Sequence, residues 1–440
     1  MPDILSDWWN LLAPGVQDAL WFALLFAPAL LTGVAVTRGY RPYGLAGAML
    51  WRFRWASLLF ALLIATSIGI GVGLIAQERA LRQGTARAAE KFDLVVSAPG
   101  SEVTMLMAAV YLQPSDVPLL SGEIYDQIAG HPDVALAAPI AFGDSHAGAP
   151  VVGTTQAFIA HLAGDLLEGR AFADPREAVA GFSAPVAPGG RFTADHGIGD
   201  AVEQGAHAGH EYTVVGRMRR TGSPWDRAIL VPVEAVWAVH GLADGHAPEN
   251  AGRLGPPFDP AYFPGTPAIL VHAEALWANY ALQSEFTRAD TMAFFPGAVL
   301  ARLHGLLGDV RRIMSVLAIV TQMLVAAGVL TGLVILTRLF SRQLALLRAL
   351  GAERRFVFAV VWCVAAALVA VGALLGVALG LAAAGIISRI VSARTEILIE
   401  ASLAWPEFHL VAAFVSATIL MALMPAAIVL ARPVVPDLRG

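Results

Sequence analysis

Residues 55–76 read WASLLFALLIATSIGIGVGLIA and contain no Asp, Glu, Lys or Arg. About 20 consecutive apolar residues are enough for an α-helix to cross a bilayer core roughly 30 Å thick. Four further runs share this property, at 19–37, 313–337, 356–388 and 410–431. The chain is 57% hydrophobic, with a mean hydropathy of +0.64. The sequence therefore predicts a membrane α-helical protein: four core membrane helices and an extra N-terminal one at 19–37.

Arginine is distributed unevenly among the segments that connect these runs. Cytoplasmic loops of membrane proteins carry an excess of basic residues. Arginines gather between the first two runs, between the third and fourth, and after the last: Arg38, Arg41, Arg52, Arg54, Arg338, Arg342, Arg348, Arg354, Arg355, Arg432 and Arg439. One orientation satisfies all of them, with 77–312 extracytoplasmic and 432–440 a cytoplasmic tail.

The N-terminal segment 1–54 has two interpretations. As a membrane helix, 19–37 would be followed by a basic inner loop. Alternatively, Trp8 and Trp9 favour an interfacial or re-entrant helix. A cleaved signal peptide is not predicted, because no basic residue precedes the run.

The segment 77–312 has the pattern of a water-soluble α+β domain, because short strands mix with short helices without regular βαβ repeats. Helical stalks are expected at 78–91 and 297–312, and 242–267 is expected to be a loop because it is rich in Pro and Gly. The expected strands are 93–97, 134–142, 151–153, 178–182, 212–216, 228–231 and 268–271, and the expected helices are 117–128, 156–162, 232–239 and 273–282.

Composition excludes several functions. The net charge of -5 argues against a nucleic-acid partner. A phosphate-binding P-loop needs a lysine followed by Ser or Thr, but the only lysine, Lys91, is followed by Phe92. No Gly-x-Ser-x-Gly motif occurs, and the single cysteine, Cys363, lies in an apolar run. The sequence thus predicts a protein that is not an enzyme and has no ATPase motif of its own.

The inner loop 338–355 reads RLFSRQLALLRALGAERR. Leu344, Leu347 and Leu350, with Leu346 beside them, recur at helical spacing, and Gly351 ends the pattern. Such an amphipathic helix can lie on a membrane surface or dock into a groove on a partner protein.

Residues 342–352, RQLALLRALGA, resemble the "REIGLLRALGA" signature of FtsX-like ABC transporter permeases. The outer segment resembles the periplasmic core domain of MacB-type members, with the strand DLVVS at 93–97, Gly169-Arg170-Ala171-Phe172, and Tyr212-Thr213-Val214-Val215-Gly216. The likeness extends over about 45–431. Gln343 stands where the family usually has Glu, and the run 19–37 is additional to the usual four spans.

This resemblance implies a permease subunit in a bacterial inner membrane, with 77–312 periplasmic, 313–431 the permease domain and the C-terminus cytoplasmic. The subunit would form a dimer (with itself or a related chain) and use a separate cytoplasmic ATPase that binds ATP and Mg²⁺. ATP hydrolysis would move the periplasmic domain to export or extract a hydrophobic or lipid-linked substrate, alone or with a periplasmic adaptor or binding protein. The residues implied in ATPase coupling are Arg342, Gln343, Leu344, Leu347, Arg348, Leu350 and Gly351.

Two other functions stay open. An FtsX-like regulator would transmit motion to an extracytoplasmic partner without transporting anything. A zinc-linked function could use His196, His207, His210 and Glu211, because His-x-x-His with a nearby carboxylate can bind Zn²⁺. The spacing is not diagnostic, and an ordinary solvated loop explains these residues as well.

Overall fold

The computed structural model describes residues 9–431 except 114, 198–208, 307 and 340. The chain divides into two compact units. The helical unit comprises Met1–Ala80, Asp309–Arg389 and Glu400–Gly440, and the sheet unit comprises Leu81–Gly308 and Ile390–Ile399. The sheet unit therefore takes its residues from two stretches that are far apart in the sequence.

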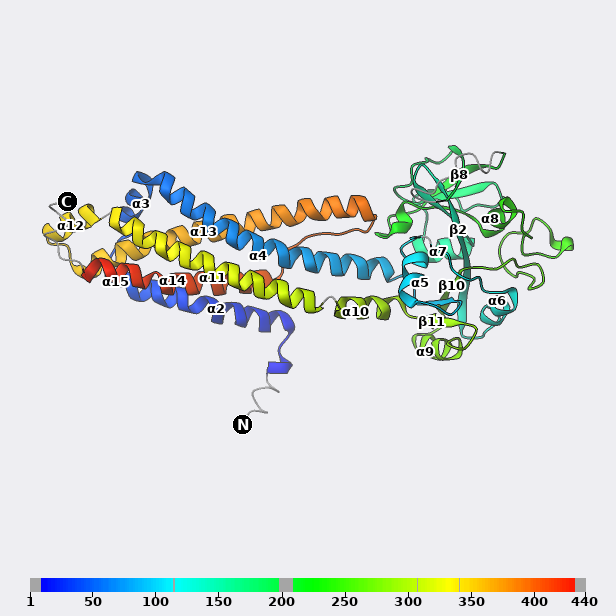
Figure 1. Cartoon of the computed structure of the whole chain (residues 1–440), viewed down its shortest axis with the longest axis horizontal. Coiled ribbons are helices and arrows are strands. Elements are labelled where there is room, and N and C mark those ends of the chain that lie inside the picture. The colour runs from blue at the N-terminus through cyan, green and yellow to red at the C-terminus, as the bar shows by residue number, and fades with distance from the viewer. Residues whose placement is uncertain (1–8, 114, 198–208, 307, 340, 432–440) are drawn as a thin grey trace. The chain divides into compact units, whose positions relative to one another are not determined.

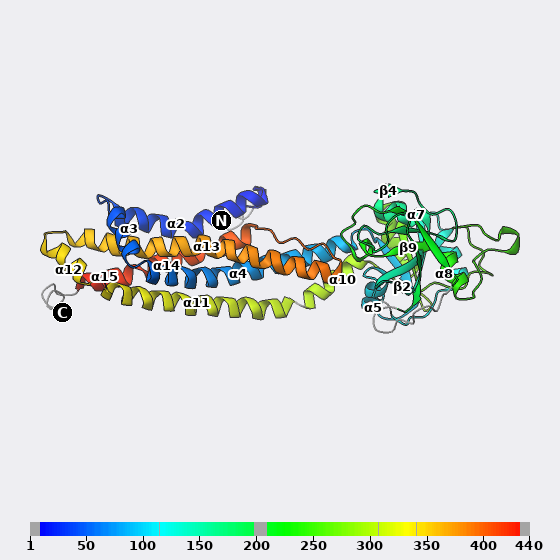
Figure 2. The same ribbon diagram turned by 90° about the horizontal axis from the view of Figure 1, so that it is seen from above.

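The long helices of the helical unit run alongside one another in two perpendicular views (Figure 1) (Figure 2). Three of them, α4, α11 and α13, contribute residues to both units, because the unit boundaries fall after Ala80, Gly308 and Arg389. The helices are α2 (Pro14–Thr37), α3 (Tyr43–Arg52), α4 (Arg54–Ala89), α11 (Gly308–Leu339), α12 (Ser341–Ala349), α13 (Arg354–Thr395), α14 (Trp405–Met421) and α15 (Leu423–Ala431).

Four segments are long and apolar enough to cross a bilayer, namely Pro14–Thr37, Arg54–Ala89, Arg354–Thr395 and Trp405–Ile428. A fifth helix, α11, is apolar over Ile319–Gly332. These helices coincide with the five uncharged runs, and the predicted membrane α-helical class is confirmed. The extra N-terminal run forms α2, which accepts two hydrogen bonds from α14. Ser416 Oγ donates to the Leu25 carbonyl at 2.6 Å, and His409 Nε2 donates to the Asp18 carbonyl at 2.9 Å.

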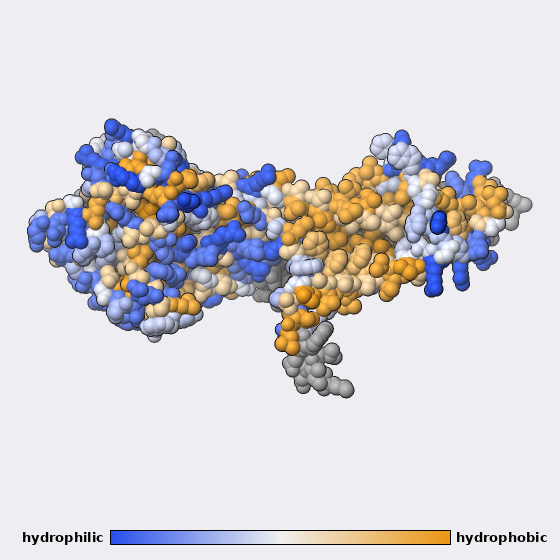
Figure 3. All heavy atoms as spheres, turned by 180° about the vertical axis from the view of Figure 1, so that it is seen from behind, coloured by the Kyte–Doolittle hydropathy of each residue, from blue (hydrophilic) through white to orange (hydrophobic). Residues whose placement is uncertain are grey.

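Large apolar side chains cover the outside of the helical unit. Leu324 and Leu374 are each 74% exposed, and Leu59 is 68% exposed. Hydrophobic residues form a band over these helices, with hydrophilic residues beyond it at the end that carries α12 (Figure 3). A surface of this kind would be unfavourable in water and is satisfied by lipid chains.

Three glycines at intervals of four residues bring α13 against α4. A Cβ atom on Gly376 would lie 2.9 Å from the Ala65 carbonyl oxygen, and one on Gly380 would lie 2.6 Å from the Gly69 carbonyl oxygen. A Cβ atom on Gly372 would lie 2.6 Å from the Ile64 Cβ atom. In a membrane, close contact between small residues is a principal source of helix association.

The sheet unit contains eleven strands among its described residues, in the order β11-β1-β10-β2-β3-β9-β5-β8-β4, with β6 on β8 and β7 on β2. The β3–β9 and β5–β8 pairs are parallel and the others antiparallel. The strands are β1 (Leu94–Ser97), β2 (Val134–His146), β3 (Ala149–Thr154), β4 (Glu168–Gly169), β5 (Glu177–Ala180), β6 (Arg191–Thr193), β7 (Asp195–His196), β8 (Glu211–Arg217), β9 (Ile229–Pro232), β10 (Ala268–Ala273) and β11 (Met292–Phe294).

Short helices flank this sheet, so the predicted α+β class is confirmed. The seven predicted strands all appear, with shifted ends. The loop 242–267 also appears, with one short 3-10 helix at Pro248–Asn250. The flanking helices are α5 (Glu102–Ala109), α6 (Gly122–Ala129), α7 (Gln156–Ala163), α8 (Val233–Val239), α9 (Leu276–Glu285) and α10 (Pro296–Leu306).

The predicted helix 117–128 is wrong in its first half. Pro118 disfavours helical backbone at the residue before it. Leu120 pairs instead with Thr266 in an antiparallel bridge. The helix α6 begins only at Gly122, where a Cβ atom would lie 2.5 Å from the Pro260 carbonyl oxygen.

Candidate functional site

The helix α12 contains the segment expected to contact an ATPase, and its leucines occupy two different faces. Leu344 is 2% exposed and lies in the core of the helical unit, with Leu347 packed against the same cluster. Leu350 is 85% exposed and Leu346 48%. The predicted stripe is therefore divided: one part fixes α12 to the bundle and the other faces outward.

The polar residues of this segment differ in exposure. Arg342 is exposed, whereas Gln343 and Arg348 are partly buried. Gly351 has φ = +95°, and the backbone N–H groups of Gly351 and Ala352 donate to Arg348 and Leu347. A glycine in this left-handed conformation is a common way for a helix to end.

Helix α3 was not predicted and packs into the same core as α12. Its Ala46 and Met49 are buried in the cluster that contains Leu344. Just beyond it, the Arg54 guanidinium lies 5.8 Å from the Trp51 ring and 5.9 Å from the Trp55 ring. Tryptophan and arginine at the end of a membrane helix commonly anchor it at the interface.

The segment Ile390–Ile399 is fixed within the sheet unit. The Leu398 N–H donates to the Gly222 carbonyl at 3.1 Å, and Glu396 lies 3.7 Å from the Arg227 guanidinium. A Cβ atom on Gly84 of α4 would lie 2.9 Å from the Leu398 carbonyl oxygen, so glycine is needed there. This segment is thus an integral part of the unit.

The turn that receives this segment is held by one carboxylate. Asp226 is 4% exposed and accepts hydrogen bonds from the N–H groups of Thr221 and Gly222 at 2.7 and 2.9 Å, and from the Thr221 hydroxyl at 2.8 Å. Hydrogen bonds to a carboxylate are stronger than those between neutral groups. They hold the Gly222 carbonyl in position to accept the Leu398 N–H.

The two short motifs of the outer segment prove to be neighbours. Gly169 of the GRAF motif pairs with Gly216, the last residue of the VVG motif, across β4 and β8. A Cβ atom on Gly169 would lie 2.1 Å from the Val215 carbonyl oxygen, and Gly169 has φ = +77°. Both glycines are therefore required by close backbone packing.

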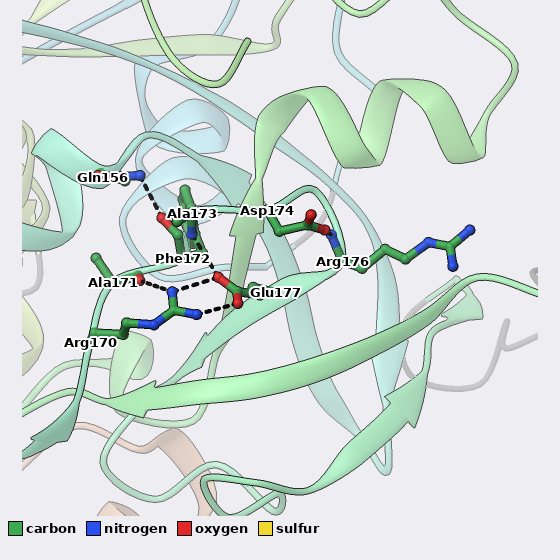
Figure 4. A network of polar contacts seen from close by, with 8 residues as sticks. All are labelled: Gln156, Arg170, Ala171, Phe172, Ala173, Asp174, Arg176 and Glu177. Carbon is green, nitrogen blue, oxygen red and sulfur yellow. Dashed lines mark hydrogen bonds and ion pairs between the residues drawn. The ribbon is translucent and has the colours of Figure 1, made fainter. Parts of the chain in front are cut away.

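Glu177 organises the rest of the GRAF turn (Figure 4). Its carboxylate forms an ion pair with Arg170 and accepts the Ala173 N–H at 2.7 Å. The hydrogen bond from Arg170 lowers the pKa of Glu177. Gln156 of α7 also donates to the Phe172 carbonyl, at 2.5 Å. The motif is a structural turn in the sheet unit.

The predicted zinc ligands are not all brought together. Glu211 forms an ion pair with Arg191 at 3.5 Å, and His210 is exposed in the turn before β8. His207 lies outside the described residues. His196 instead faces Asp144 on the adjacent strand, at 3.2 Å.

Several residues that the structure places together are far apart in the sequence. Asp144 and His240 lie beside His196 but are distant from it in the chain, and no local spacing indicates them. The pairing of Arg79 with Glu407 at 2.7 Å is equally non-local. In contrast, the repeat of Gly372, Gly376 and Gly380 is visible in the sequence and could have predicted helix packing.

Comparison with known proteins gives one family match, to the FtsX-like permease C-terminal model over residues 312–432. No curated protein sequence matches the chain. Among solved structures, the periplasmic region of MacB from Actinobacillus actinomycetemcomitans aligns at 10% identity with a TM-score of 0.31, covering 50% of this chain and 95% of that one. The extracellular domain of the noncanonical ABC-type transporter YknZ from Gram-positive bacteria aligns at 12% identity with a TM-score of 0.27, covering 46% of this chain and 98% of that one.

The matched residues begin near the start of α11 and include α12, α13, α14 and α15. They therefore contain the helix with the RQLALLRALGA segment, the glycine contacts of α13 and the segment Ile390–Ile399 that lies in the sheet unit. The resemblance noted on the inner loop is confirmed for this part of the chain, since residues 312–432 match the FtsX-like permease C-terminal model.

Proposed function

We propose that this chain is the permease subunit of an ABC-type transporter, and that a separate ATPase drives movement of its sheet unit. The observation that carries the proposal is the position of Ile390–Ile399. These residues belong to the permease domain by sequence and to the sheet unit by packing. Because α13 is continuous up to Thr395, a displacement of this helix would be passed to the Gly222 turn.

The ATPase contact is proposed for the outward face of α12. Leu350 and Leu346 are exposed there, and Arg342 is beside them, whereas Leu344 and Leu347 hold the helix in the bundle. An amphipathic helix that is fixed on one side and apolar on the other suits a hydrophobic groove. The sequence supports a separate ATPase, since the single lysine cannot serve a P-loop.

The proposed orientation follows from the arginines. The loop that contains α12 is basic and would lie in the cytoplasm with the ATPase. The sheet unit would then lie on the opposite side, in the periplasm of a bacterium with an inner membrane. A dimer of this chain would supply two α12 helices for a pair of ATPase subunits.

The first experiment measures ATP hydrolysis by the isolated complex in nanodiscs. Leu350→Ala and Arg342→Ala should each reduce the stimulation of the ATPase by the permease. Leu324→Ala is the matched control, because Leu324 is similarly exposed, on α11. Equal stimulation by all three variants would overturn the assignment of α12, and failure to isolate an ATPase with the chain would overturn the function.

The second experiment tests the connection through Ile390–Ile399. Cys363 is the only cysteine, so a Cys363→Ser chain with Ser284→Cys carries one spin label on the sheet unit. Distances between labels in the dimer should change when ATP is added. Leu398→Pro removes the N–H that donates to Gly222 and should abolish this change while ATP hydrolysis continues. Glu249→Ala, in the exposed loop, is the control.

A further inference from the structure

Three potential metal ligands from separate elements meet in the sheet unit. Asp144 lies on β2, His196 on β7, and His240 directly after α8. One oxygen of the Asp144 carboxylate is 3.2 Å from His196 Nδ1 and 3.6 Å from His240 Nε2. One ligand atom from each residue lies within 4.8 Å of the other two. The His196 and His240 rings have centroids 5.4 Å apart.

The two separations from the Asp144 oxygen are close to the edge length of a metal coordination tetrahedron. Zinc binds imidazole nitrogen and carboxylate oxygen at about 2.1 Å, so two ligands of a tetrahedral ion are about 3.4 Å apart. The two distances from the Asp144 oxygen lie on either side of this value. Two imidazoles and one carboxylate form a ligand set typical of zinc and its neighbours in the first transition series.

A backbone hydrogen bond gives the His240 ring a suitable tautomer. Its Nδ1 is 2.8 Å from the Val236 carbonyl oxygen. A carbonyl can only accept, so Nδ1 carries the proton, and in the neutral ring Nε2 presents its lone pair towards Asp144. Histidine ligands of metals usually donate their other ring N–H in this way, which fixes the ring for coordination.

The sheet positions the other two ligands. Asp144 and His196 are direct partners in the antiparallel β2–β7 pair. The strand is irregular between Phe142 and Asp144, where Gly143 has φ = +153°. A bulge changes the direction of the side chains that follow it. The Asp144 side chain after this bulge is buried, with 4% of it exposed. A buried carboxylate beside two imidazoles strongly favours a cation in the same place.

The group is also accessible from solvent. The side chain of His196 is 46% exposed and that of His240 29% exposed. His240 also lines an open pocket of about 260 Å³, together with Asp116 and Trp237. Three protein ligands leave a fourth position for water or another donor, as in zinc sites that are not purely structural.

We propose that Asp144, His196 and His240 form a binding site for a divalent transition-metal ion, with Zn²⁺ the leading candidate. Asp144 supplies an oxygen, His196 its Nδ1 and His240 its Nε2. The site lies in the sheet unit and does not depend on the proposed transport function. The competing interpretation is a purely hydrogen-bonded group, in which the two histidines pair with Asp144 and bind no metal.

The test is zinc titration of the full chain in detergent, after treatment with a chelator and in competition with a fluorescent zinc indicator. The wild type should bind one Zn²⁺ per chain. His196→Ala and Asp144→Asn should weaken binding at least about tenfold. His272→Ala is the matched control: His272 also forms an ion pair with an aspartate, Asp93, and its ring lies 4.6 Å from that of His161.

Two further measurements separate a metal site from a structural role. Co²⁺ in place of Zn²⁺ should give the intense visible absorption of a tetrahedral ion in the wild type and in His272→Ala, but not in His196→Ala. Zinc should also raise the thermal unfolding midpoint of the wild type and of His272→Ala, but not that of His196→Ala. Because His196 is half exposed, its variant should fold even if Asp144→Asn does not. Wild-type zinc affinity in His196→Ala, or no binding by the wild type at micromolar Zn²⁺, would overturn the proposal.

Discussion

The Arg79 guanidinium on α4 donates to both carboxylate oxygens of Glu407 on α14, at 2.7 and 2.9 Å. Glu407 is 1% exposed and also accepts the Ala404 N–H at 2.9 Å. The ion pair thus joins two helices of the helical unit and caps the start of one of them.

Removing one charge of this pair should destabilise the protein, because the other charge stays buried without its partner. We expect Glu407→Ala to cost roughly 3–5 kcal/mol, as for other buried ion pairs. Thermal unfolding in detergent measures the effect. Asp290→Ala breaks the more exposed pair with Arg288 and should have an effect below about 1 kcal/mol. Similar shifts for both variants would contradict the role given to Glu407.

The contact between α4 and α13 depends on the absence of a side chain at Gly376. Gly376→Ala should lower the unfolding midpoint, since its Cβ atom would lie 2.8 Å from Ile68 Cβ and 2.9 Å from the Ala65 carbonyl oxygen. Gly385→Ala, on the same helix, is the control: a Cβ atom there has nothing within 4 Å. Alanine usually favours a helix over glycine by up to about 1 kcal/mol, so this control should be neutral or stabilising.

The GRAF turn should be intolerant of any side chain at its first position. Gly169→Ala combines a left-handed backbone with a contact of 2.1 Å to the Val215 carbonyl oxygen. Gly189→Ala has a similar φ of +83° and nothing within 4 Å. The control should therefore show only the backbone cost of roughly 1–2 kcal/mol. Limited proteolysis of the sheet unit should distinguish them, and equal resistance would refute the importance of the close approach.

The free energy of unfolding of the sheet unit should fall as the pH rises from about 4.5 to about 7, because the buried Glu234 carboxyl is protonated in the folded state over this range. Burial raises the pKa of Glu234 to about 7, with a further rise from Asp244 and a partial reduction by the Gly255 N–H. In that range the folded state keeps a proton that the unfolded state has lost, and above it the contribution is constant. Burial lowers the pKa of His246 below its ordinary value. In the pH range just below that ordinary value, this histidine makes the stability of the sheet unit rise with pH, which opposes the effect of Glu234.

Glu234→Gln isolates this effect, because glutamine resembles the protonated carboxyl. The variant should be more stable than the wild type at pH 8, on the order of 2 kcal/mol, and similar to it at pH 5. Hydrogen exchange in the loop 242–267 provides the measurement, since Glu234 accepts the Gly255 N–H there. A constant difference at both pH values would show that Glu234 is ionised in the folded protein.

The elements predicted most accurately were those with strong local patterns. Uncharged runs identified the membrane helices, and the longer strands such as β2 and β8 were also predicted. The short strands β6, β7 and β11 have two or three residues each, too few to show a period. Helix α5 was also missed, although Ser101 accepts the Thr104 N–H at its start. Its sequence, EVTMLMAA, has little periodic contrast.

The candidate site was only partly visible in the sequence. The α12 segment is local, so its residues could be named, but the separation of Leu344 from Leu350 depends on what packs against the helix. Spacing along the chain directed attention to His207 and His210, whereas strand pairing brings Asp144 to His196. Metal ligands that lie on neighbouring strands come together only in the correct strand register, and a single sequence does not specify that register well.

The split composition of the sheet unit also sets an order of events during synthesis. The end of the segment Ile390–Ile399, residues 396–399, emerges from the ribosome after α11, α12 and α13. The bond from Leu398 to Gly222 and the ion pair of Glu396 with Arg227 can therefore form only after those helices have been made. The sheet unit therefore stays incomplete until this late segment of the chain has been made, so its folding cannot finish before the helices that precede the segment have been synthesised.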